Sequence, residues 1–256
     1  MVGTLLLRGM MVGVLAGLLG FAFLKFAGER PVDRAIAFET AQAKVEAQAM
    51  ADKGMPMPSP EPELVSRKVQ AGIGLFTGIM VYSAAFGGLF ALAFALAHGR
   101  MADLAPRATA ALLAAAGFVA VYVVPMLKYP ANPPSVGEPE TIGMRTALYF
   151  GMIALSLAAM IAAGMLRGRL QRRLGSWNAV LIAGAAYVAA MAIAIAALPA
   201  IDEMPADFPA TVLWQFRLAA TGGQAILWAT LGLAFGPLAE RAMAARRPGA
   251  ARISAF

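Results

Sequence analysis

The chain has 256 residues, of which 60% are apolar and 14% charged, with a net charge of +7 and no cysteine. This composition is typical of an all-α polytopic helical bundle in a membrane rather than of a soluble domain. The missing cysteines exclude disulfides, thiolate metal sites and iron–sulfur clusters. No GxxxxGK[ST] phosphate loop occurs, which excludes nucleotide hydrolysis by that route.

Apolar stretches of membrane-spanning length divide the chain. They cover residues 5–26, 69–97, 108–127, 146–166, 177–198 and 212–238. Each can cross about 30 Å of hydrocarbon as a helix, which rises about 1.5 Å per residue. The first stretch is followed by Lys25 and Glu29 without a small-residue cleavage site, so we interpret it as a helix and not as a signal peptide. The sequence therefore predicts about six transmembrane helices in a single membrane domain, residues 1–256.

Basic residues lie on alternate connections between these stretches. They are Arg100 and Arg107 in the second connection, Arg167, Arg169, Arg172 and Arg173 in the fourth, and Arg241, Arg246, Arg247 and Arg252 in the tail, residues 239–256. Because cytoplasmic loops carry an excess of Lys and Arg, we expect a multi-pass protein of a bacterial inner membrane with both termini and the tail cytoplasmic. The positive net charge is then a topology signal, and we do not predict binding to nucleic acid.

The first connection, residues 27–68, is predicted to be extracytoplasmic. A helix is expected from Pro31 to Gly54, and the proline-rich residues 55–63 favour an extended polyproline form. On that helix Glu39 and Glu46 fall on one face, so they are candidate metal-binding carboxylates. A solvated helix surface is the alternative. Glu29 and Asp33, interleaved with arginines, predict an ion-paired helix start.

The third connection, residues 127–145, is crowded with prolines and is predicted to form a stiff cap over the bundle. Glu138 and Glu140 offer oxygen ligands on this frame and are further candidate metal-binding residues. Tyr129 and Asn132 add oxygens, and a purely structural cap is the alternative. The single histidine, His98, lies at a helix end, where a structural role is favoured over metal binding.

Four polar residues lie close to mid-depth on different helices: Ser83, Ser156, Tyr187 and Gln224. The helix centres carry no Asp, Glu, Lys, Arg or His, so these four are our candidates for a transport path. The alternative is that they only join helices by hydrogen bonds.

Glycines recur every fourth residue on several helices, and this spacing predicts close helix packing. They are Gly9, Gly13 and Gly17 on the first stretch, Gly74 and Gly78 on the second, followed there by Gly87 four residues after Ser83, and Gly232 and Gly236 on the last. Arg217 near the end of the last stretch is expected to reach the membrane interface.

Three segments carry a resemblance to a known family. They are GERPVDRAIAFE (Gly28 to Glu39), SRKVQAGIGLFTGIMVYSAAFGGLFALAFA (Ser66 to Ala95) and LKYPANPPSVGEPETIGMRTALYF (Leu127 to Phe150). Together they resemble the CbtA family of predicted cobalt transporter subunits. The resemblance implies a membrane subunit for cobalt uptake linked to cobalamin biosynthesis, with cobalt as substrate and no permanently bound cofactor. It also implies a partner, a small one-helix protein with a histidine-rich segment, and a topology usually described as five spans.

Two other functions stay open. A non-conducting scaffold or assembly subunit, partnering a metal-binding one-helix protein, would have the same hydropathy and glycine spacing. A membrane enzyme acting on lipid or quinone is less favoured, because no paired catalytic acids or nucleophile with its base stand at a membrane face. We therefore predict that the chain is not an enzyme and that its surroundings are the lipid bilayer, and the sequence leaves assembly into a homo-oligomer open.

Overall fold

A computed structural model describes residues 2–55, 65–100, 104–134 and 136–244. In order, its elements are α1 (Val2–Ala27), α2 (Glu29–Asp52), α3 (Arg67–Val69), the π-helix η1 (Gln70–Gly74), α4 (Leu75–Ala97), α5 (Pro106–Gly117), the π-helix η2 (Phe118–Val123), α6 (Val124–Lys128), the 3₁₀-helix η3 (Pro139–Thr141), α7 (Ile142–Ala197) and α8 (Ala210–Ala244). The described residues contain no strand, so the predicted all-α class is confirmed. The prolines after Met55 and the tail beyond Ala244 lie outside the described residues.

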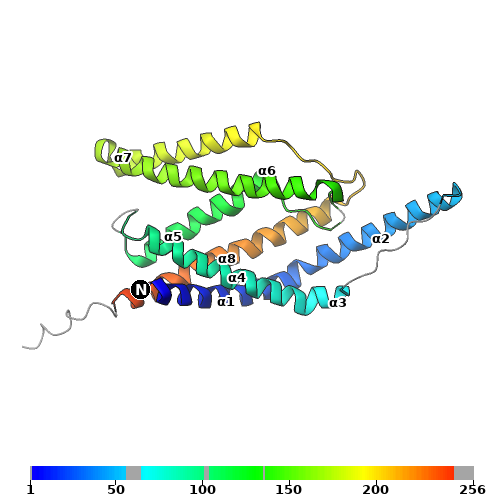
Figure 1. The fold of residues 1–256 in the computed structure, drawn as a ribbon, viewed down its shortest axis with the longest axis horizontal. Coiled ribbons are helices and arrows are strands. Elements are labelled where there is room, and N and C mark those ends of the chain that lie inside the picture. Colours follow the sequence, from blue (N-terminus) through cyan, green and yellow to red (C-terminus); the bar gives the residue numbers. More distant parts are fainter. Residues whose placement is uncertain (1, 56–64, 101–103, 135, 245–256) are drawn as a thin grey trace, which may run out of the picture.

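Five helices are long and apolar enough to cross a membrane: α1, the α3–α4 run, the α5–α6 run, the run ending in α7, and α8. The α7 run contains two crossing segments, because the chain reverses at Gly175, whose φ of 77° is in the left-handed region that favours glycine. Figure 1 shows its two arms lying side by side. The predicted stretches 146–166 and 177–198 fall on these arms, so a polytopic bundle is confirmed. The arginines between them continue the first arm as helix, where the sequence predicted a loop.

Among the described residues, two hydrophobic cores lie within the bundle, and a third, smaller cluster around Ala35 and Phe208 joins α2 to the start of α8. In the larger core, α1, α4, α5 and α8 bury Leu5, Phe94, Leu231 and Phe235 almost completely. The smaller core joins the two α7 arms to α6 and contains Met152. α1 and α4 lie on one side of the molecule and the α7 hairpin on the other (Figure 1). The α5–α6 run, which is the third crossing segment, lies between them and contributes residues to both cores.

Glycine allows α1 and α4 to approach backbone to backbone. A Cβ atom at Gly13 would overlap the carbonyl oxygen of Ser83, and one at Gly87 would overlap that of Gly9 and lie 2.9 Å from Gly13 Cα. The predicted close packing is confirmed here, and also where Gly232 and Gly236 meet α5. It is wrong for Gly78, which has open space around it, and for Gly74, which meets only the carbonyl of Val69 in its own helix.

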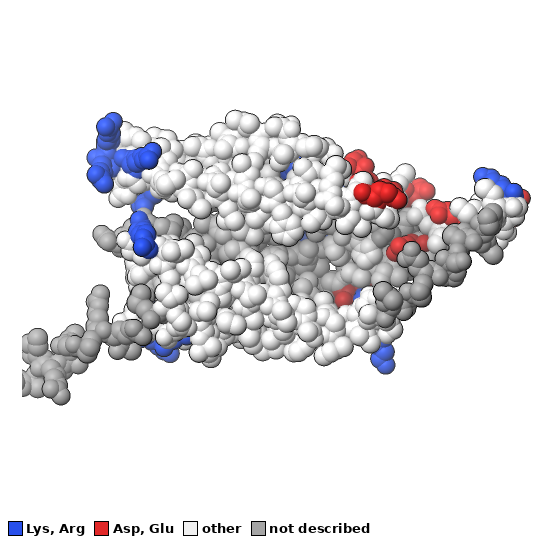
Figure 2. Space-filling model, in the orientation of Figure 1, with Lys and Arg blue, Asp and Glu red and all other residues white. Residues whose placement is uncertain are grey.

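Charge separates the two ends of the bundle (Figure 2). One end, here called the basic end, contains the α4–α5 connection, the Gly175 turn and the end of α8, with most of the arginines. The other, called the acidic end, contains α2 and the connections on either side of α7. Its carboxylates include Glu138, Glu140, Asp202, Glu203 and Asp207.

Candidate functional site at the acidic end

A cavity of about 490 Å³ opens at the acidic end. It lies where the third crossing segment, the connection before α7, the first turns of α7, the connection before α8 and Arg217 of α8 meet. Its volume lies in the range of ~300–1,000 Å³ that is usual for small-molecule sites. Its polar lining includes Tyr122, Tyr149, Arg145, Asp202, Glu203 and Arg217.

Glu203 fastens the rim of this cavity. Its Oε2 accepts a hydrogen bond of 2.8 Å from the backbone N–H of Glu138 and lies 3.4 Å from Nε of Arg145. The hydroxyl of Thr141, then the Glu138 N–H, and finally the charge of Arg145 lower the pKa of this carboxyl below its ordinary value. Glu203 is therefore ionised at neutral pH and ties the connection before α8 to the start of α7.

Gly137 makes this arrangement sterically possible. Its φ of 111° is one that residues with a Cβ rarely adopt. The guanidinium of Arg145 lies directly over it, and a Cβ atom there would overlap Nη1 and stand 2.6 Å from Cζ. From this position Arg145 donates through Nη2 to the Glu138 carbonyl at 3.0 Å. Glycine at 137 thus allows the connection and Arg145 to interlock.

Arg217 is held by neutral groups. Its Nε donates to the Ala131 carbonyl at 3.2 Å, and its Nη2 donates to Oδ1 of Asn132 at 2.9 Å. The guanidinium that was expected to reach the membrane interface is bound to the connection before α7. It therefore fixes the proline-rich cap onto α8 and lines the cavity.

Tyr122 lines the cavity and is hydrogen-bonded to Thr221 of α8. Their hydroxyls are 2.8 Å apart, and Thr221 also donates to the Arg217 carbonyl at 2.7 Å. Tyr122 lies in η2, and Tyr129, after α6, donates to the Pro199 carbonyl at 3.0 Å. The hydroxyls in this region are thus engaged in ties between segments far apart in the sequence.

The predicted metal-binding carboxylates remain dispersed. Glu39 and Glu46 are exposed on α2, and Glu138 and Glu140 are exposed on the cap. Among the described residues no group of three or more His, Cys, Asp or Glu is arranged to hold a metal ion. These residues can contribute negative potential and outer oxygen ligands. His98 bonds to Thr109 Oγ1 at 3.2 Å and stacks on Phe94 at the basic end.

Of the four predicted transport-path residues, the structure brings two together. Ser156 and Tyr187 face each other between the arms of α7, both buried, with their hydroxyls 2.8 Å apart. Ser83 packs on α1 against Gly13 and Gly17, and Gln224 is half-buried on α8. The polar groups therefore occupy separate places in the bundle and do not form one contiguous layer.

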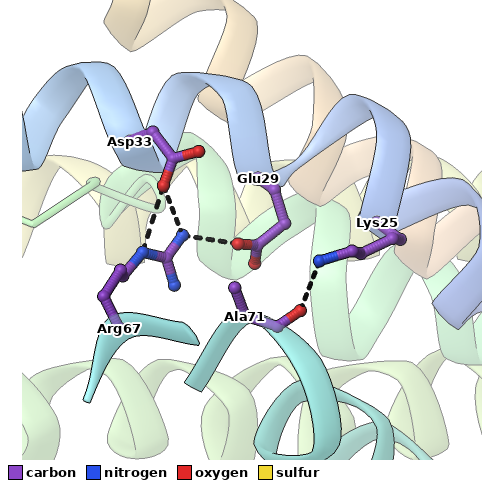
Figure 3. Close-up of polar contacts among 5 residues, drawn as sticks. All are labelled: Lys25, Glu29, Asp33, Arg67 and Ala71. Atoms are coloured by element: carbon purple, nitrogen blue, oxygen red, sulfur yellow. Dashed lines mark hydrogen bonds and ion pairs between the residues drawn. The ribbon is translucent and has the colours of Figure 1, made fainter. Parts of the chain in front are cut away.

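The start of α2 is ion-paired, as predicted, but the arginine that pairs there is Arg67 of α3. Arg67 binds Glu29 and Asp33 together, the latter at 2.9 and 3.1 Å, as Figure 3 shows. Lys25 donates at 2.7 Å to the carbonyl of Ala71, which lies in the π-helix η1 beside Gly72, whose φ and ψ are non-helical. These contacts fasten the base of α2 to the start of the second crossing segment.

Sequence reasoning missed the role of Arg145, Glu203 and Arg217 around the cavity. The charges were visible in the sequence, but Glu203 is 58 positions from Arg145, and Ala131 is 86 positions from Arg217. The one local signal was Gly137 within a proline-rich connection, which indicates a backbone turn but not what lies against it.

Comparison with known proteins gives one match. A sequence model of the family described as "Probable cobalt transporter subunit (CbtA)" matches residues 2–240. No curated protein and no solved structure matches.

Proposed function

Since this chain belongs to the CbtA family of probable cobalt transporter subunits, we propose that it is the membrane subunit of a cobalt uptake system supplying cobalamin biosynthesis. The observation that supports uptake most is the distribution of charge along the bundle. The described carboxylates, Glu240 apart, lie at one end with lysines and arginines among them, whereas the charged residues of the other end are almost all arginines. A divalent cation is repelled less by the first end and, when the interior is negative, gains about 4.6 kcal/mol on crossing 100 mV. Transport of this kind needs no catalytic residues, and cobalt is the substrate rather than a cofactor.

This proposal places the acidic end outside the cytoplasmic membrane and both termini in the cytoplasm. The cysteine-free chain allows a direct test with single cysteines at Ala206, in the connection before α8, and at Ser176, beside the Gly175 turn. Both side chains are exposed. We expect an impermeant thiol reagent to label Ala206→Cys in intact cells and Ser176→Cys only after permeabilisation. The reverse pattern would refute the orientation.

The exposed carboxylates of α2 and of the cap are proposed to concentrate the cation before it enters. Replacing Glu39 and Glu46 with Gln, or Glu138 and Glu140, should raise the cobalt concentration for half-maximal uptake about two- to fivefold at low ionic strength, because each pair removes two negative charges. The measurement is initial uptake rate against cobalt concentration. Asp52→Asn with Asp207→Asn is the control: it removes the same charge from two separate exposed places, and its effect should be smaller, because each charge is screened within about 10 Å. An unchanged half-maximal concentration for both pairs would reject capture by these residues.

The hydroxyls of Ser156 and Tyr187 are proposed to supply oxygen dipoles along the path, with Ser83 and Gln224 in secondary positions. Support comes from their burial and mutual hydrogen bond in a bundle whose helix centres carry no charge. Ser156→Ala with Tyr187→Phe should reduce uptake at least about fivefold, while stability falls by only ~0.6 kcal/mol, the usual contribution of such a bond. Uptake and thermal stability are measured on the same variant. Full uptake by the double variant would remove the pair from the path.

The alternative is a scaffold that holds a metal-binding, histidine-rich one-helix partner and conducts nothing itself. The dispersed carboxylates of the described residues favour this alternative, because they leave first capture of the metal to another subunit. Uptake measured with and without that partner distinguishes the two functions.

A further inference from the structure

The cavity at the acidic end contains a guanidinium that no carboxylate of the described residues neutralises. Arg145, the other arginine of the lining, has Glu203 as its ion-pair partner. Arg217 has only the Ala131 carbonyl and the Asn132 side-chain oxygen, and among the described residues no carboxylate lies within ion-pair distance of it. Its Nη1 has no hydrogen-bond acceptor among the described groups. A full positive charge with an unused donor therefore lines the cavity.

The rest of the lining suits an anion with an organic body. Tyr149 and Phe150 contribute aromatic surface from the first turns of α7, and Met126 and Ile142 contribute aliphatic surface. The one acidic lining residue besides Glu203 is Asp202, whose side chain is exposed, so water screens its charge more than that of half-buried Arg217. The described lining has two arginines and two carboxylates, so the unbalanced positive charge is local to Arg217, which no described carboxylate contacts.

We propose that this cavity binds an oxyanion, a carboxylate or a phosphate, whose oxygens accept hydrogen bonds from Arg217. Guanidinium donors match the geometry of both groups, and a hydrogen bond to an ion is stronger than one between neutral groups. The anion can come from a phospholipid headgroup at the membrane surface or from a soluble carboxylate or phosphate. This site goes beyond the proposed function and does not rest on it. At such a site the charge of Arg217 repels a bare divalent cation, which is attracted instead to the exposed carboxylates.

The test uses the purified full chain in detergent micelles with three separate probes: citrate, inorganic phosphate and phosphatidylglycerol. Binding is measured by calorimetry for the soluble anions and by native mass spectrometry for the lipid. Arg217→Gln should weaken binding at least about tenfold, the loss expected for a charge-assisted hydrogen bond. Arg217→Lys should retain most of it, and Lys128→Gln, a basic residue of the same end outside the cavity lining, should leave binding unchanged.

A second pair of variants avoids any disturbance of the cap. Asp202→Asn removes a negative charge from the cavity rim and should tighten anion binding about two- to threefold. Asp207→Asn removes an exposed charge from the same connection outside the lining and should not. Binding of the lipid alone would identify the headgroup as the source of the oxyanion, and binding of citrate or phosphate would identify a soluble one. No binding of any probe, or equal effects of the cavity variants and their controls, would overturn the proposal.

Discussion

Replacing Gly87 with alanine should lower the free energy of unfolding by about 3 kcal/mol or more, at the upper end of what overpacking costs. The reason is that the new Cβ would meet backbone and not a movable side chain. It would overlap the Gly9 carbonyl oxygen and lie 2.9 Å from Gly13 Cα, so α1 and α4 would have to move apart along their contact. Membrane helices associate through such close packing, since lipid supplies no hydrophobic drive between them.

The matched control is Gly78→Ala on the same helix, where a Cβ atom would have nothing within 4 Å. We expect this variant to be as stable as the original chain or slightly more stable, because alanine favours helix over glycine. Reversible unfolding in mixed micelles gives both values. Equal stability of the two variants would show that α1 and α4 do not approach as described.

Replacing Gly137 with alanine should open the rim of the cavity and lower the free energy of unfolding by about 2 kcal/mol, mostly through the cost of a positive φ. Here the overlapping atoms belong to the end of the Arg145 side chain, which can swing away. The expected consequence is that Arg145 leaves Glu203 and the Glu138 carbonyl. Gly143→Ala, which meets open space in the first turn of α7, is the control.

The pH dependence of stability distinguishes this outcome from simple backbone strain. A carboxyl whose pKa is lowered by folding stabilises the protein above its unfolded pKa, about 4.3 for Glu, and loses that contribution as the pH falls through the lower folded value. The original chain should therefore lose the Glu203 contribution below about pH 4. In Gly137→Ala this acid-side loss should shrink by the part that the charge of Arg145 supplies, the smallest of the three contributions that lower the pKa of Glu203, while the bonds from Thr141 and the Glu138 N–H remain. If the variant lost as much stability in acid as the original chain, Arg145 would not stabilise the ionised form of Glu203.

The crossing segments and the helix after the first of them were predictable, because each depends on composition within about 20 to 30 consecutive residues. The expected helix from Pro31 to Gly54 is α2, Glu29–Asp52. The Gly175 reversal was less visible. The arginines around it indicated a loop, but they remain helical up to a single glycine that turns the chain. The difference between five long helices and six crossing segments comes from that residue.

Contacts between the segments that connect the helices were not predictable, because the packing of the helices decides which connecting segments lie side by side. Arg67 joins Glu29 and Asp33 only because α2 continues from α1 and its base lies beside the start of the second crossing segment. Ser83 was placed at the same depth in the membrane as Ser156 and Tyr187, but it does not contact that pair. They belong to opposite halves of the bundle, and hydropathy contains no information about which helices are neighbours.

The central claim is that this chain carries cobalt across a membrane, and uptake of radioactive Co²⁺ into vesicles containing only the purified chain tests it most directly. We expect accumulation above empty vesicles that grows when an inside-negative potential is imposed, towards a limit of about a thousandfold at 100 mV. No uptake by correctly folded chain, with the potential imposed and both orientations present, would contradict the account. Uptake that appears only when the histidine-rich partner is added would assign conduction to the complex.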